Sequence, residues 1–84
     1  MIVLISTFQK PVQEDLSPER AVLRKQLLDK HKALGHTDGT FRVVSPTQVE
    51  ITFLSRQAAE AFAADAQIIS NQFNQTVSFE YREE

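Results

Sequence analysis

The sequence predicts a small α+β domain in which two helices cover one face of a four-stranded antiparallel sheet. Between residues 41 and 53, apolar and polar residues alternate on both sides of a turn at Ser45-Pro46, which is typical of a hairpin of half-buried strands. From Ala58 onward the apolar residues recur at helical spacing instead. An apolar run and a first helical pattern precede the hairpin, and alternation returns near residue 80. The predicted order is therefore strand, helix, strand, strand, helix, strand.

The first strand is expected at residues 2–5, whose sequence Ile-Val-Leu-Ile is apolar without interruption. Such runs are typical of strands that lie centrally in a sheet and are covered on both faces. Residues 9–16 have no clear periodicity and are expected to form a loop.

The first helix is expected from Pro18 to about Leu34. Ser17 suits the N-cap, and Pro18 suits the first helical position because its missing N–H would have no intrahelical partner there. Gly35 is expected just after the helix, in the left-handed conformation that other residues resist. The residues that share the apolar face of this helix are Leu23, Leu27, Leu28, His31 and Leu34.

The hairpin is followed by a second helix with Ser55 as its N-cap, a polar connector at residues 71–75 in which Phe73 is expected to be buried, and a last strand from Val77 to Arg82. This order is the split βαβ, or ferredoxin-like, arrangement, in which both helices lie on one sheet face. The predicted inward side chains are Phe41, Val43, Val49, Ile51, Phe53, Val77, Phe79 and Tyr81, with one side of the first strand. We expect Phe62 of the second helix to contact Phe53.

Length and composition restrict the possible functions. A chain of 84 residues with 42% hydrophobic residues can bury one small core, so a single domain over residues 1–84 is expected. A formal net charge of -2 gives no electrostatic reason to bind nucleic acid or an anionic membrane. The absence of cysteine excludes disulfides and zinc–sulfur sites. The N-terminal apolar run is too short to span a membrane and lacks signal-peptide flanks, so a cytoplasmic location is expected.

Two histidines and one aspartate are the candidate catalytic or metal-binding residues. His36 and Asp38 would suit an acid–base or metal pair, but a polar turn is the favoured interpretation of their Gly-containing loop. His31 lies in the apolar stripe of the first helix, where a hydrogen-bonded histidine at the edge of the core is the favoured interpretation. The sequence has no phosphate-binding glycine motif and no serine-nucleophile motif. We therefore predict no catalytic, cofactor-binding or metal-binding residue, and an enzyme is the less favoured class.

The stretch VEITFLSRQAAEAFAA, residues 49–64, resembles the third strand and second helix of an RNA recognition motif. The resemblance implies nucleic-acid binding as an alternative function, through aromatic side chains on the exposed sheet face on which bases stack. The outward positions of this strand are Glu50 and Thr52, and Phe53 is expected to face inward. Nucleic acid is therefore not the favoured partner.

The first strand, the Leu-rich helix and the stretch TFLSRQAAEAFAAD are similar in layout to small dimeric α+β barrel proteins such as YCII-like domains. In those proteins two ferredoxin-like sheets pack face to face. The resemblance implies, as another alternative, a small-molecule enzyme or ligand binder. Its pocket would lie between sheet and helices, around His31, Tyr81 and residues 35–40.

The sheet face that no helix covers is the main functional indication in the sequence. We predict a non-enzymatic protein-interaction module that uses this face, with Arg42, Glu50, Thr52, Glu80 and Arg82 as the interaction residues. The outward apolar side chains of the first strand would lie near solvent in a monomer, which favours a homodimer formed through this face or through an edge strand. In the alternative, the long polar side chains fold over these apolar groups and the protein stays monomeric.

Overall fold

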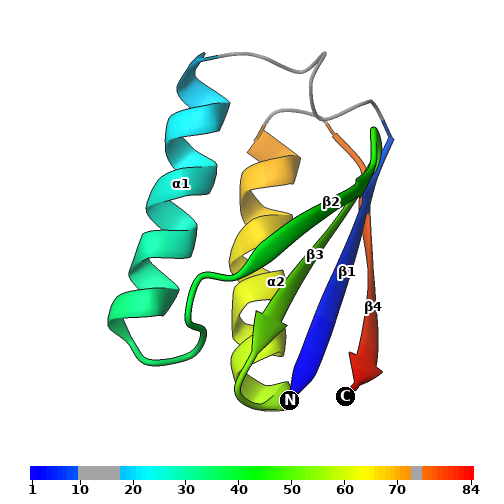
Figure 1. Ribbon diagram of the computed structural model, residues 1–84. Helices are drawn as coiled ribbons and strands as arrows, with labels where there is room; N and C mark the ends of the chain where they lie inside the picture. The colour runs from blue at the N-terminus through cyan, green and yellow to red at the C-terminus, as the bar shows by residue number, and fades with distance from the viewer. Residues whose placement is uncertain (10–17, 73–74) are drawn as a thin grey trace.

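A computed structural model describes residues 1–9, 18–72 and 75–84 of the chain. The predicted α+β, ferredoxin-like order is confirmed (Figure 1). The elements are β1 (Ile2–Phe8), α1 (Pro18–Ala33), β2 (Phe41–Ser45), β3 (Gln48–Phe53), α2 (Arg56–Gln72) and β4 (Val77–Glu83). The expected N-cap Ser17, the loop at residues 10–16 and Phe73 lie outside the described residues.

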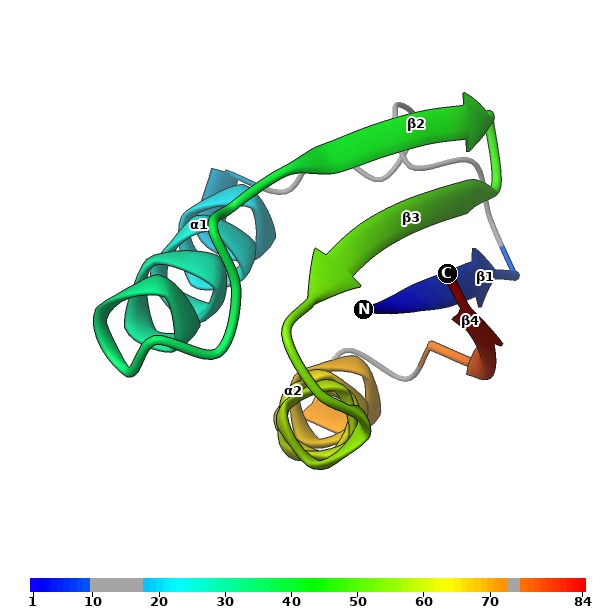
Figure 2. The same ribbon diagram turned by 60° about the horizontal axis from the view of Figure 1, so that its bottom comes forward.

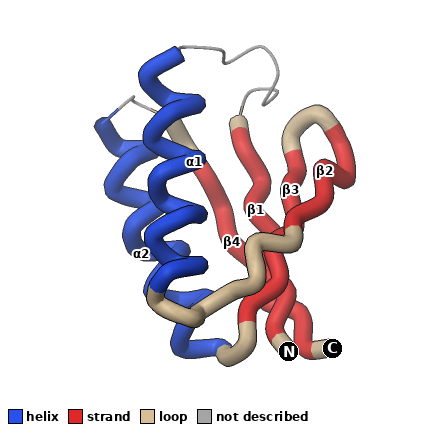
Figure 3. The backbone as a smooth tube through the Cα atoms, turned by 60° about the vertical axis from the view of Figure 1, so that its left-hand side comes forward, coloured by secondary structure: helices blue, strands red, loops and turns tan. Residues whose placement is uncertain are grey.

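The four strands form one antiparallel sheet in the order β2-β3-β1-β4. β1 is central, as its apolar run predicts, and Leu4 pairs with Ile51 on one side and Tyr81 on the other. Both helices lie on the same side of the sheet, and no helix formed by the described residues lies on the other side (Figure 3). Two edge strands remain, β2 and β4, because each pairs with only one neighbour.

The core lies between α2 and the two inner strands. Phe53 and Leu4 are both 0% exposed, and the rings of Phe53 and Phe62 lie 5.2 Å apart between centroids. This contact confirms the predicted meeting of β3 and α2. Tilted aromatic pairs at such distances add to the stabilisation that comes from burying the rings.

The predicted helix-ending and helix-starting residues are also confirmed. Gly35 has φ +75°, and the N–H groups of Gly35 and His36 donate to the carbonyls of Lys32 and His31 at 3.0 Å each. These two bonds form a Schellman motif, which satisfies carbonyls at the helix end. At the start of α2 the Ser55 hydroxyl accepts a bond from the Ala58 N–H at 3.2 Å, as an N-cap does.

Phe41 and Val43 face the helix side of the sheet as predicted, but they are not buried in the core. Their partners in the β2–β3 ladder, Ile51 and Val49, place them on the helix side of the sheet, yet they are 58% and 53% exposed. The cause is the position of α1, which packs against α2 and leaves β2 uncovered (Figure 2). Leu34, also expected on the buried face of the first helix, is exposed because it follows the end of α1.

Candidate functional site

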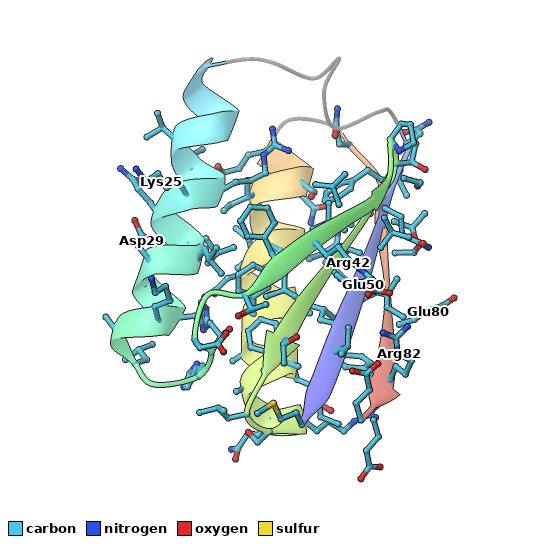
Figure 4. The ribbon with its side chains drawn as sticks, in the orientation of Figure 1. Lys25, Asp29, Arg42, Glu50, Glu80 and Arg82 are labelled. Carbon is cyan, nitrogen blue, oxygen red and sulfur yellow. The ribbon has the colours of Figure 1, made fainter. Side chains whose placement is uncertain are left out.

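The five predicted interaction residues do share the open face of the sheet. Arg42 of β2 stands opposite Glu50 of β3, and on β1 Ile5 stands between Glu50 and Glu80. Val3 of β1 likewise stands between Thr52 of β3 and Arg82 of β4. Figure 4 shows the four charged members of this set along the open side of the strands.

Arg42, Glu50 and Arg82 are paired with one another on this face. Arg42 Nη2 lies 2.8 Å from Glu50 Oε1, and Arg82 Nη1 lies 3.1 Å from Glu50 Oε2. Arg82 also contacts Glu84 at 2.8 Å. The hydrogen bond from Arg82, followed by that from Arg42, lowers the pKa of the Glu50 carboxyl. A partner that recruited either arginine would therefore have to compete with Glu50.

This network crosses the central strand. Because β1 lies between β3 and β4, the Arg82–Glu50 pair spans β1, and Val3 beneath this face is only 4% exposed. Ile5 remains half-buried. The expectation that the outward half of the apolar run lies near solvent is thus wrong for Val3 and holds in part for Ile5. Among the described residues no aromatic ring lies on this face, so it offers no platform for base stacking.

A second cluster, which the sequence analysis missed, joins α1, α2 and the loop after α1. His31 is 2% exposed, and its Nε2 lies 3.0 Å from Asp65 Oδ2. Its Nδ1 lies 2.8 Å from Nδ1 of His36. Lys30 Nζ, 3.2 Å from the same Asp65 oxygen, adds an exposed positive charge. We call the chain of contacts Asp65–His31–His36 the histidine relay.

The relay fixes the positions of protons by hydrogen-bond chemistry. A carboxylate only accepts, so Nε2 of His31 donates to Asp65. In the neutral form Nδ1 of His31 is then an acceptor, and Nδ1 of His36 must donate to it. The remaining nitrogen, Nε2 of His36, keeps its lone pair. When both histidines are protonated, both Nδ1 atoms carry hydrogens and this bond is lost.

The favoured interpretation of His31, a hydrogen-bonded histidine at the core, is borne out, whereas the two functional alternatives for the histidines are not formed. Asp38 does not join His36, because its Oδ1 accepts from the Thr40 N–H at 2.8 Å. Hydrogen bonding from the Thr40 side chain, and then from the Thr40 backbone, lowers the pKa of Asp38. His31 packs edge-on against Phe62, whereas Tyr81 lies under the guanidinium of Arg56 at 4.5 Å. Tyr81 also lines a hollow beside Met1, Leu54 and Arg56 that His31 does not line.

The pKa of Asp65 predicts a pH effect on stability. The hydrogen bond from His31 and then that from Lys30 lower this pKa below its ordinary value of 3.8. A carboxyl whose pKa is lower in the folded state than in the unfolded state stabilises the fold. This stabilisation is complete at pH values above the unfolded-state pKa and is lost as the pH falls through the folded-state pKa. Asp65→Asn is therefore expected to be less stable than wild type at neutral pH, with a difference that shrinks toward about pH 3. Urea unfolding at both pH values checks this, and a difference that stays constant with pH contradicts it.

The described residues, 1–9, 18–72 and 75–84, include no group of three or more histidine and acidic side chains that could hold a metal ion. No helix among them is long and apolar enough to cross a membrane. In comparisons with known proteins, no family model matches the chain and no curated protein matches it in sequence.

Proposed function

We propose that this protein is a non-enzymatic interaction module that associates with a second copy of itself along edge strand β2. The observation that carries the proposal is the exposure of three apolar side chains on this one short strand. Phe41, Val43 and Val44 are 58%, 53% and 45% exposed. Exposed apolar edge strands are templates for pairing with another chain, and proteins that remain monomeric usually protect them.

The two edges of the sheet differ in this protection. β4 carries Glu80, Arg82 and Glu83, and charged side chains on an edge oppose pairing. β2 has Arg42 as its one charged residue, and that charge is already paired with Glu50. β2 is therefore the edge that favours a partner.

The backbone of β2 is also oriented for pairing. The Thr52 N–H donates to the Thr40 carbonyl at 3.2 Å, and hydrogen-bonded and non-hydrogen-bonded pairs alternate along an antiparallel ladder. By this alternation Arg42 bonds to Glu50, whereas the N–H and C=O groups of Phe41 and Val43 point away from β3. These groups are free to extend the sheet by one more strand.

The β2 strand of a second copy would supply hydrogen-bond partners for these outward N–H and C=O groups. Antiparallel pairing about a two-fold axis at Val43 would join two sheets, pair Val43 with its own copy, and set Phe41 of each chain diagonally next to Val43 of the other. The Arg42–Glu50–Arg82 network would remain intact on the open face and could border the contact as a polar rim. The open face, with Ile5 at its centre, is the second candidate surface for the same association.

Sedimentation at micromolar and then near-millimolar concentration tests the proposal. We expect a dimer that Val43→Pro dissociates, because proline removes an outward N–H without removing a β2–β3 hydrogen bond. Glu83→Pro, which makes the same change on exposed β4, is the matched control and should leave the dimer unchanged. Ile5→Lys tests the open face.

A single species of monomer mass at all concentrations would overturn self-association. Dissociation by Ile5→Lys but not by Val43→Pro would move the interface from β2 to the open face. Circular dichroism spectra of both variants must match wild type for either result to be used.

A further inference from the structure

An apolar groove between α1 and the sheet shares strand β2 with the proposed interface. Its volume is about 560 Å³. The groove exists because α1 packs against α2, while its backbone stays apart from the strands (Figure 2). Phe41 and Val43 of β2 belong to its lining. A chain that pairs with β2 therefore also comes to the border of this groove.

The exposure of the lining residues shows where the groove opens. Leu27 of α1, Ile51 of β3 and Phe62 of α2 line it and are buried. Phe41 and Val43 line it as well, but each is more than half exposed. The groove is therefore closed toward β3 and α2 and open to solvent along β2.

Pairing of two β2 strands brings a new side chain to this opening. A two-fold axis at Val43 sets Phe41 of the second copy diagonally next to Val43 of the first, at a Cβ separation of about 7–8 Å that an aromatic ring can bridge. Residues two positions apart on a strand share a face, and Phe41 and Val43 both face the helix side. In the joined sheet, the ring of the second copy thus faces the helix layer of the first.

The wall of the groove that α1 forms can receive such a ring. Leu28 lines the groove and is only half-buried, so it offers apolar surface to a partner. Lys25 and Asp29 also belong to the lining, and Figure 4 shows both pointing away from the sheet. A ring between Leu28 and Val43 would meet hydrocarbon on both sides. Removal of this apolar surface from water is favourable in proportion to its area.

The area that a stable dimer needs also favours this contact. Specific protein interfaces typically bury about 1,200–2,000 Å² in total. β2 has only five residues, so backbone pairing of two such strands is a small contact. An aromatic side chain buries about 150–250 Å², and the two-fold axis makes the same contact twice.

We propose that the ring of Phe41 from a second copy fills the open side of the groove, between Leu28 and Val43 of the first. This inference rests on the proposed association through β2, and it names the side chain on which that association depends. The groove is complete only in the dimer, because each copy supplies the side chain that closes the groove of the other.

Phe41→Thr tests the contact, since threonine suits a strand and preserves the pairing of β2. We expect it to weaken the dimer by at least about tenfold, as loss of a buried aromatic anchor does. Leu54→Thr is the matched control. Leu54 is 57% exposed, against 58% for Phe41, but lines a different hollow, so its replacement should leave the dimer unchanged.

Two substitutions on α1 test the other wall. Leu28→Ala should weaken the dimer by about tenfold, whereas Val22→Ala, at an exposed position of the same helix, should not. Adding Phe41→Thr to Leu28→Ala should weaken the dimer little further, because the effects of residues in contact are not additive. Full additivity of the two changes in folded variants would contradict the contact.

Intermolecular nuclear Overhauser effects locate the ring even where a variant fails to fold. In a mixture of ¹³C-labelled and unlabelled protein, we expect ring protons of unlabelled Phe41 to contact methyl groups of labelled Leu28 and Val43. These signals should vanish when the unlabelled copy is Phe41→Thr.

The possible failures are distinguishable. A dimer that Val43→Pro dissociates, but that lacks these signals and is unchanged by Phe41→Thr, would overturn the groove contact and leave association through β2 intact. A monomer at all concentrations, or dissociation by Ile5→Lys alone, would overturn association through β2 and the groove contact with it.

Discussion

Phe53→Ala is expected to lower the free energy of unfolding by about 3–5 kcal/mol, which is the usual cost of removing a phenylalanine ring from a core. Phe53 is completely buried, and its ring contacts that of Phe62 in the layer between β3 and α2. A loss of this size is a large part of the total stability of so small a domain. Urea unfolding followed by circular dichroism measures it.

Phe41→Ala is the matched control, because it removes the same ring from the same side of the sheet. Phe41 is 58% exposed, so this change should cost less than about 1 kcal/mol. If Phe41→Ala were the more damaging of the two, α1 would have to cover β2 in solution. The exposed edge at β2 would then be absent.

His31→Ala is the second change with a large expected effect, about 2–4 kcal/mol. It opens a cavity beside Phe62 and removes the partner of both Asp65 and His36 in the histidine relay. His31→Leu restores much of the volume but no hydrogen bond. The difference between the two variants therefore separates packing from hydrogen bonding in the measured free energy of unfolding.

Lys30→Ala is the control for the relay. Lys30 contacts the same carboxylate oxygen of Asp65 as His31 does, but its side chain is 59% exposed. Exposed ion pairs contribute about 0–1 kcal/mol, so this variant should remain near wild type. Equal losses in Lys30→Ala and His31→Ala would mean that the buried imidazole adds nothing beyond a surface charge pair.

The periodic patterns were sufficient to predict the elements and the faces of the central strands. β1 and β3 could be oriented because one-residue alternation decides which side chains point to the helices, and Phe53 met Phe62 as expected. The exposure of Phe41 could not be predicted in this way. It depends on where α1 packs, and a helical stripe indicates which face is buried but not against which layer.

The histidine relay was only partly accessible to the same reasoning. Gly35 was correctly placed after the helix, and a Schellman motif brings the second residue beyond the helix end, His36, back to His31. A Schellman motif expected at Gly35 was therefore the signal from which the contact between His31 and His36 could have been predicted. Asp65 lies 34 positions from His31, and its approach depends on how α1 packs against α2. No local pattern contains that information.

The central position of β1 has a consequence for how the chain folds. Both of its ladders join distant residues, since Ile2 pairs with Phe53 on one side and with Glu83 on the other. Among the strand pairs of the described residues, the β2–β3 hairpin alone is local. Most of the sheet therefore forms only after long loops have closed, and the entropy of that closure is lost before pairing compensates it. We expect high contact order, with folding slower than in helical bundles of equal length and with insertion of β1 between its neighbours as the limiting step.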